Sequence, residues 1–288
     1  MLLSMVTQVR PPSRIRTVCL FLNVQFNRYL GIYGAIWKNS LIREMGFKSN
    51  FLLWIVVEFL WFGLQLGFIT VIYQHTENIA TWTKWEVVLL IGSSQLVQQL
   101  FSAFFLSNCT QLSEHIRTGR LDFMLLLPVN TRFLISFRQV DLGGFVNAGT
   151  AIAVVWYASR QLHLNPTVIQ ILGFFFLICC GVLIHYALVL SLSSLSFWTV
   201  RAQGIVWGYY NFLTIGRWPE AAFHGFFKAF FTLAVPMLLV TNVPAKHLIP
   251  RLEQPVQLAT LVGLTIGFLG LSEIVWRKSL QRYASASS

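Results

Sequence analysis

EHIRTGRLDFMLLLPVNTRFLISFR, residues 114–138, is a polar stretch that separates two long apolar segments. It contains four arginines, two acidic residues, a glycine and a proline. A loop that only joined two membrane helices could be shorter and less charged, since most connections between helices are short. The stretch therefore predicts a surface outside the membrane on which another protein docks.

The composition of the whole chain is that of a membrane protein. Of the 288 residues, 56% are hydrophobic and only 11% are charged, whereas charged residues make up about 25% of a typical soluble domain. Several apolar runs reach about 20 residues, the length that crosses a bilayer core as a helix. The predicted fold class is an all-α, polytopic membrane protein.

Six apolar segments are expected to span the membrane, namely 51–73, 86–107, 139–158, 167–195, 225–243 and 256–276. The segment 196–224 between the fourth and fifth spans is rich in Trp, Tyr and Arg, which predicts a piece of chain on the membrane surface. Pro244, Pro250 and Pro255 predict a non-helical connection before the last span.

The region before the first span shows helical periodicity over residues 26–41, with basic residues away from the apolar stripe. This pattern predicts an amphipathic helix in the membrane interface, although an ordinary packed amphipathic helix has the same periodicity. The predicted domain organisation is an N-terminal segment 1–50, a six-helix transmembrane domain 51–276 with its polar segment 108–138, and a tail 277–288. The stripe consists of Phe26, Tyr29, Leu30, Tyr33, Ile36, Trp37 and Leu41.

The net charge of +11 comes from basic residues that flank the apolar runs, which argues against nucleic acid as a partner. Six spans place both termini on one side. Only four of the 21 Lys and Arg residues then fall on the other side, and 17 fall on the side of the termini and of residues 114–138. The positive-inside rule predicts that this side is cytosolic. The four on the opposite side are Lys84, Arg160, Lys246 and Arg251.

Sequence motifs for enzymatic chemistry are missing from the chain. There is no GxxxxGK[ST] phosphate loop and no HExxH, so any ATP would have to be bound by another chain. An intramembrane lipid-modifying enzyme usually needs clustered acids for a metal or a diphosphate, and this chain has only two aspartates, Asp122 and Asp141. The four cysteines have no metal or disulfide spacing.

The polar stretch resembles a segment of the permease subunits of type-2 ABC (ABC-2) transporters, mostly exporters. That family carries approximately E-x-x-x-G-T-L-E-x-L-L-x-x-P-V-S between its second and third spans, with a basic residue about ten positions after the proline. Here Glu114 begins the motif, and residues 119–122, GRLD, resemble G-T-L-E with Arg for Thr and Asp for Glu. Leu125 and Leu126 match the leucine pair, residues 128–130 match P-V-S with Asn for Ser, and Arg138 takes the basic position.

The resemblance implies a bacterial six-span permease without a large extracellular domain, in the cytoplasmic (inner) membrane. It implies separate P-loop ATPase subunits that bind ATP and Mg²⁺, a second permease subunit, and no cofactor in this chain. It also implies that a cytosolic coupling helix between spans two and three contacts the ATPase. The coupling residues would be Glu114, Arg117, Gly119, Arg120, Leu121, Asp122, Leu125, Leu126, Pro128 and Arg138.

Residue chemistry gives this segment a physical interpretation. Gly119 can end a short helix in a left-handed cap, and Asp122 can begin another helical turn. We expect Leu121, Leu125 and Leu126 to pack against the membrane domain, and the charged residues at 114, 117 and 120 to pair with the ATPase. The alternative is a solvated loop whose arginines only set the topology.

Polar residues inside the predicted spans are the other candidate site. Glu58, Gln65, Gln95, Gln99 and Ser102 could line a transport pathway, because ionisable groups in spanning helices are costly and often functional. They could equally hold helices together by hydrogen bonds. A channel or scaffold that needs no ATPase remains an alternative function.

Overall fold

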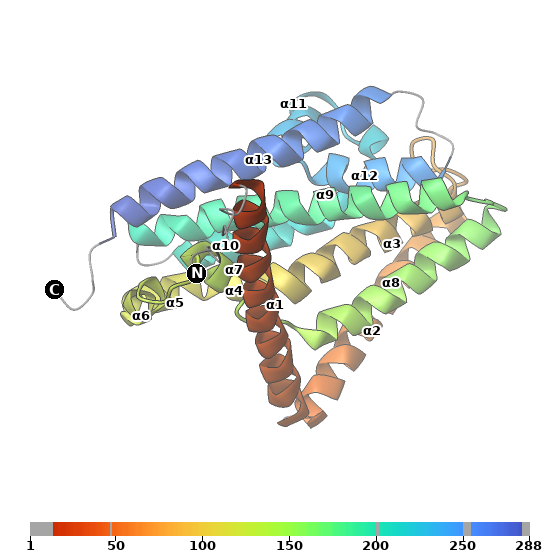
Figure 1. Ribbon diagram of the computed structural model, residues 1–288. Coiled ribbons are helices and arrows are strands. Elements are labelled where there is room, and N and C mark those ends of the chain that lie inside the picture. The colour runs from red at the N-terminus through yellow and green to blue at the C-terminus, as the bar shows by residue number, and fades with distance from the viewer. Residues whose placement is uncertain (1–13, 47, 200–201, 250–254, 284–288) are drawn as a thin grey trace, which may run out of the picture.

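The computed structural model describes residues 14–46, 48–199, 202–249 and 255–283, and it contains no β-strand within these ranges (Figure 1). The first half comprises α1 Arg14–Gly46, α2 Lys48–His75, α3 Lys84–Phe101, the π-helix η1 Ser102–Leu106, α4 Ser107–Thr110, α5 Leu112–Arg117, α6 Arg120–Leu125, α7 Thr131–Phe137 and α8 Leu142–Gln161. The second half comprises α9 Val168–Ser193, η2 Ser194–Phe197, α10 Ala202–Phe212, η3 Leu213–Arg217, η4 Glu220–Ala222, α11 Gly225–Ala229, η5 Phe230–Ala234, α12 Met237–Leu248 and α13 Pro255–Gln281.

Five helical segments of the described chain are long and apolar enough to cross a membrane, and a sixth is possible if a bent pair is one span. The five agree with predicted spans one, two, three, four and six to within a few residues, except that the second continues to Arg117. They are Lys48–His75, Lys84–Arg117, Leu142–Gln161, Val168–Phe197 and Val256–Gln281.

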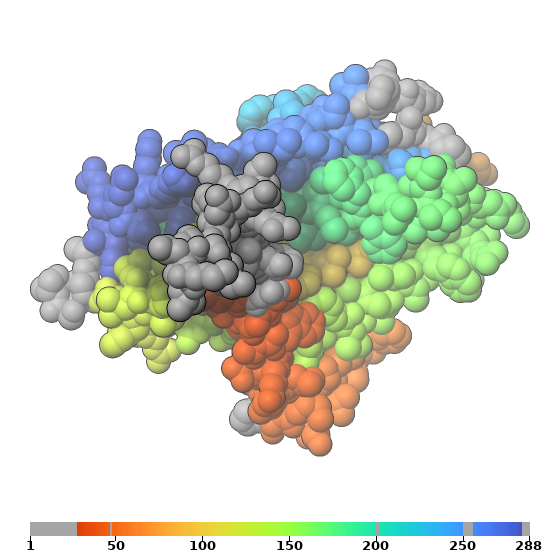
Figure 2. Space-filling model, viewed as in Figure 1, coloured from red at the N-terminus to blue at the C-terminus, as the bar shows by residue number. Residues whose placement is uncertain are grey.

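Two ends of the bundle can be distinguished by their contacts. Residues 112–138 lie at one end, here called the motif end, where Phe197 stacks edge-on against Trp276 and Tyr283 at the close of α13. In the space-filling view the α5–α6 region lies beside this end of α13 (Figure 2). At the other end, here called the distal end, Lys246 pairs with Glu220 and donates to Gln257 near the start of α13.

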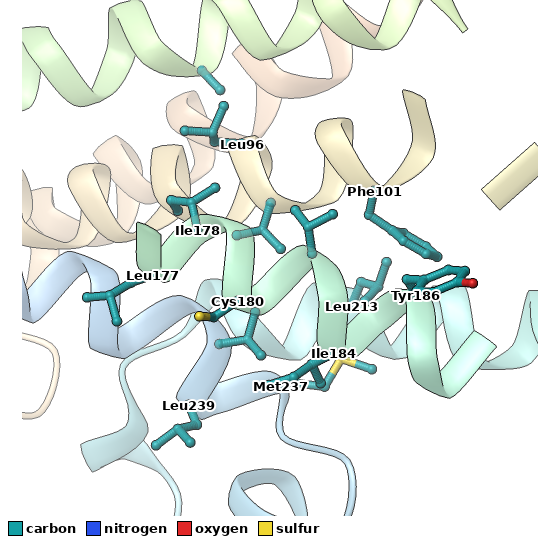
Figure 3. Packing of buried hydrophobic residues seen from close by; sticks show 14 of the residues in the cluster. Leu96, Phe101, Leu177, Ile178, Cys180, Ile184, Tyr186, Leu213, Met237 and Leu239 are labelled. Atoms are coloured by element: carbon teal, nitrogen blue, oxygen red, sulfur yellow. The ribbon is translucent and has the colours of Figure 1, made fainter. Parts of the chain in front are cut away.

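The core is built around α3 and α9. Of the most apolar 18-residue window of the second span, 83% is buried, against 11% for α2, so α3 is central and α2 peripheral. Figure 3 shows α9 between α3 and α12, with Leu96 and Ile178 on facing sides. Close approach depends on small residues: a Cβ on Gly181 would lie 2.5 Å from Val240 of α12. In a lipid bilayer there is no hydrophobic driving force between helices, so helices associate through close packing at small residues such as this glycine.

The π-helix η1 joins the central helix to the motif end. The Ala103 carbonyl in this π-helix accepts from the Asp141 amide at 3.0 Å. Asp141 in turn caps α8 through the Gly143 and Gly144 amides. The Asn108 side chain closes the same joint with two bonds to the Gln139 backbone at 2.7 and 2.8 Å. The second and third spans are thereby fixed to each other on either side of residues 112–138.

The predicted fifth span, 225–243, is not one straight helix but falls within a bent pair of helices. The chain reaches Glu220 at the distal end, and its amide donates to Asn242 while its carboxylate pairs with Lys246. Segments α11–η5 and α12, which meet at a bend of 81°, therefore begin and return near the same end. The chain instead runs from Phe197 at the motif end to Glu220 through α10 and η3. The described residues 202–222 form a broken helix that packs on the bundle through the buried Val206, Tyr209 and Leu213, whereas Trp207 and Phe212 are exposed.

Two further differences concern prolines and the N-terminal helix. Pro244 lies inside α12, contrary to the predicted break, whereas Pro255 begins α13 as a proline at a first helical position can. Pro250 lies outside the described residues. Helix α1 crosses the bundle steeply near the motif end (Figure 1). Tyr29 and Tyr33 stack on Phe133 and Phe137 of α7, while the predicted stripe residues Leu30 and Leu41 are exposed.

The path of the chain predicts which loops share a side of the membrane. In a background without the native cysteines, His224→Cys and Asn165→Cys should react with a membrane-impermeant thiol reagent from one side. Arg282→Cys should react from the other side, because α10–η3 crosses the bundle before residue 224. Labelling of His224→Cys together with Arg282→Cys would restore 225–243 as a span.

Candidate functional site

The predicted coupling segment folds into two short helices that meet at a left-handed glycine. Helix α5 ends at Arg117, and the amide and hydroxyl of Thr118 both donate to the Glu114 carbonyl. Gly119 follows with φ 69° and ψ 5°, and α6 begins at the next residue. Glycine adopts this conformation without steric penalty. The predicted left-handed cap is confirmed, and it makes α5 and α6 one compact projection, here called the knob (residues 112–127).

Charged residues on the outer face of the knob pair with each other. Arg117 donates from Nε and Nη2 to the two carboxylate oxygens of Glu114, at 3.0 and 2.9 Å. Both side chains remain largely exposed. An exposed pair contributes only about 0–1 kcal/mol to stability. The pair therefore fixes the pattern of surface charge on the knob rather than its fold.

The residues that seat the knob differ from those expected. Leu121 is fully buried and Met124, one turn later on the same face, is nearly so. Leu125 and Leu126 point outward with 37% and 81% of their surface exposed, and Phe123 is also exposed. The prediction that the leucine pair packs against the membrane domain is wrong, since α6 leaves Gly119 at an angle that turns positions 121 and 124 inward.

Arg132 is the main connection between the knob region and the spanning helices. It lies in the first turn of α7, after Asn130, whose side chain caps that helix through the Arg132 and Phe133 amides. Its guanidinium pairs with Glu273 and donates to Ser272 at 3.0 Å, both on α13. It also donates to the Tyr186 hydroxyl of α9 at 3.1 Å. From the sequence, Arg132 is expected only to contribute to membrane topology, and no role is predicted for Tyr186 or Glu273.

A second connection joins the knob to the start of the third span. Arg138 donates from Nη1 to His115 Nε2 at 3.2 Å. That ring nitrogen must be an acceptor, so the geometry requires a neutral His115. At the end of α13, burial and the neighbouring Asp122 raise the pKa of Tyr283 to about 12. Arg138 of the predicted coupling set thus holds the knob, whereas Glu114, Arg117, Arg120 and Pro128 are exposed.

The predicted pathway residues come together along α2 and α3. Gln99 donates to Glu58 across the two helices at 3.2 Å. Two cavities share Glu58 and Tyr210 in their walls. The proximal cavity, about 570 Å³, also contains Gln99 and Ser102. The distal cavity, about 630 Å³, also contains Gln65 and Gln95. Glu58 therefore fits both predicted roles, because it accepts a hydrogen bond that joins two helices and also lines a cavity.

Arg217 belongs to this polar cluster and was not predicted. It donates from Nη2 to Gln98 Oε1 at 2.8 Å and to Gln95 Oε1 at 3.4 Å. Gln98 donates in turn to the Tyr210 hydroxyl at 2.9 Å. Sequence reasoning placed residues 196–224 on the membrane surface, and no local signal brings Arg217 to the middle of α3. Its helical spacing from Tyr210, seven residues on one face, is the feature that could have suggested it.

An apolar helical bundle with a polar intramembrane cavity and an anchored projection at one end defines a class of integral membrane protein suited to transport. A family model described as ABC-2 family transporter protein matches residues 59–287. The chain therefore belongs to the ABC-2 family and is an ABC-2 type permease, the membrane component of an ABC transporter. Searches of curated proteins and of solved structures gave no match.

The Arg132 connection can be tested by stability. Arg132→Gln removes hydrogen bonds from a charged donor that are worth about 1.5–3 kcal/mol, so we expect a lower Tm in detergent. Glu273→Gln should cost less, since the amide still accepts, and it should add little in the Arg132→Gln background. Arg277→Gln, which removes only an exposed partner of Glu273, is the matched control. An unchanged Tm for Arg132→Gln would contradict the anchoring role.

Proposed function

We propose that this permease is the membrane subunit of an ATP-driven exporter in the bacterial cytoplasmic membrane, and that separate P-loop ATPase subunits dock on the knob. ATP and Mg²⁺ are bound by those subunits. Both termini and the knob face the cytosol, and α1 lies in the membrane interface. A second permease, identical or similar, completes the pathway. Family membership supports the ATPase partner, and the charge asymmetry of the sequence supports the cytosolic side.

The observation that carries the docking proposal is the contrast between the two faces of the knob. Its inner face is fixed to the bundle by Leu121 and Met124, and its outer face exposes Phe123 and Leu126. Beside it, a groove of about 570 Å³ runs between α6 and Ile32 and Ile36 of α1. Exposed apolar side chains outside the membrane mark interaction surfaces. A projection anchored to α9 and α13 can transmit force from such a surface to the spanning helices.

The pathway proposal rests on where the polar cavities open. Both lie along α2, whose outward side chains, including Trp54, Trp61 and Leu64, are exposed. Lipid tails in direct contact with Glu58 and Gln65 would leave polar groups unsatisfied. A second permease against α2 and α10 would close the cavities between two subunits. The proposed pathway residues are Glu58, Gln65, Gln95, Gln99 and Ser102.

Charge inversion tests docking. Glu114→Lys combined with Arg117→Glu preserves an ion pair within α5 but inverts the pattern presented to a partner, so the fold should be retained. Like charges across a docked interface cost several kcal/mol, and we expect loss of ATPase co-purification and of ATP hydrolysis stimulated by the permease. Phe123→Ser/Leu126→Ser should weaken association in the same assay, whereas Leu121→Asp should lower the folded yield.

The informative controls are the two single variants, Glu114→Lys and Arg117→Glu. Each breaks the ion pair within α5 without inverting the charge pattern that the knob presents to a partner. Normal ATPase association and stimulation by a folded Glu114→Lys/Arg117→Glu protein would overturn the docking proposal. The 114–138 segment would then be a loop that sets topology, and an ATPase-independent channel or scaffold would become the better function.

Subunit number tests the pathway proposal. The complex purified in lipid nanodiscs should contain two permease subunits by mass measurement, and crosslinks between cysteines placed on α2 should join them. A complex that is active with one permease copy would exclude a pathway formed between two subunits.

A further inference from the structure

Arg217 is a largely buried cation that uses few of its hydrogen-bond donors within the described chain. Among the described residues no carboxylate forms an ion pair with it, and its only hydrogen bonds are the two from Nη2 to glutamine side chains. Its Nε is buried and has no partner. A guanidinium has five N–H donors, and a charge inside a spanning bundle is costly unless it is paired. Glu58 is close enough to stabilise the Arg217 charge electrostatically but forms no ion pair with it, so an anionic group can bind to the donors that remain.

The distal cavity beside Arg217 is amphipathic. Helix α2 contributes the apolar side chains Trp61, Phe62, Leu64 and Phe68 together with the polar Glu58 and Gln65, and α3, α10 and η3 contribute amides and other polar groups. Its volume of about 630 Å³ falls in the range of about 300–1,000 Å³ typical of small-molecule sites. The wall chemistry fits a molecule with a polar group at one face and an apolar chain at the other.

Glu58 gives the cavity a second, opposite charge. Arg217 donates to Gln95 and Gln98 of α3, and Glu58 accepts from Gln99 of the same helix. Both charges line the distal cavity, and among the described residues no ion pair joins them. A ligand that carries both an anionic and a cationic group can bind to the two charges together.

We propose that the distal cavity binds a zwitterionic amphiphile. Its anionic phosphate or carboxylate accepts from Arg217, its cationic group lies at Glu58, and its apolar chain packs on the aromatic wall of α2. This inference rests on the proposed function in taking the cavity as part of the pathway, and it adds the charge pattern of the transported molecule. The ligand can be a bilayer phospholipid or a separate small amphiphile, since both carry the same headgroup chemistry.

Three probes with the same alkyl chain test the charge pattern: dodecylphosphocholine, dodecyl phosphate and dodecyltrimethylammonium. Binding to the purified permease, without ATPase, is measured by native mass spectrometry from maltoside micelles. Wild-type protein should bind the phosphocholine most tightly. Arg217→Gln should weaken the phosphocholine and the phosphate by about tenfold or more, the effect of losing roughly one charged hydrogen bond. Binding of the ammonium should not weaken.

Glu58→Gln should give the opposite pattern, with weaker phosphocholine and ammonium and tighter phosphate. Arg160→Gln is the matched control, because Arg160 packs over Trp156 away from the cavity and its loss should change none of the three. Thr214→Phe tests the site without removing a charge. The Thr214 hydroxyl donates only to the Asn211 carbonyl within η3 and α10, so the larger side chain should fill the cavity and weaken all three probes.

Two results would overturn the inference in folded protein: equal binding of all three probes by the wild type, or an unchanged order of affinities in Arg217→Gln. Arg217→Lys, which keeps the charge, should bind better than Arg217→Gln, and the reverse would also count against the site. Repeating the measurement after reconstitution in phosphatidylcholine and in phosphatidylglycerol nanodiscs separates the two ligand sources. Weaker probe binding in phosphatidylcholine alone identifies bilayer lipid as the occupant, and equal binding identifies a separate amphiphile. Because no ATPase is present, failure here is distinct from failure of the docking proposal.

Discussion

The buried pair between Glu220 and Lys246 is the contact on which the arrangement of the second half of the chain depends. Both side chains are nearly inaccessible, and a broken buried pair leaves an uncompensated charge. The pair brings together the two ends of a segment of more than twenty residues, so both ends of this segment lie at the distal end. The chain runs from the motif end to Glu220 by way of α10 and η3. This path is what carries Arg217 and Tyr210 to the amides of α3.

The parts of the fold that the sequence predicts well are those in which one local property decides the structure. Five apolar segments are long enough to span, and each is a helix at nearly the expected positions. Gly119 has the left-handed conformation expected of a glycine between two helical turns. The fifth predicted span differs for a physical reason: residues 225–243 have the apolar length of a span, yet the structure bends them by 81°. Only tertiary contacts show that Tyr210 and Arg217 of the preceding segment bond to glutamines of α3.

In the candidate sites, too, the sequence predicts the features that a local property decides and not those that tertiary contacts decide. Helical spacing was enough to group Gln95, Gln99 and Ser102 with Glu58 and Gln65, because neighbouring helices bring such faces together. It could not show that Leu121 and Met124, rather than Leu125 and Leu126, seat the knob, since that depends on the angle at which α6 leaves Gly119. Nor could it show that Arg132 reaches across to Glu273, more than a hundred residues later.

The π-helix Ser102–Leu106 sets the rotational phase of the second span between the polar cavities and the knob. A π-turn holds one more residue than an α-turn, and one residue corresponds to about 100° of rotation about the helix axis. The extra residue therefore decides the direction in which the knob faces relative to Gln99.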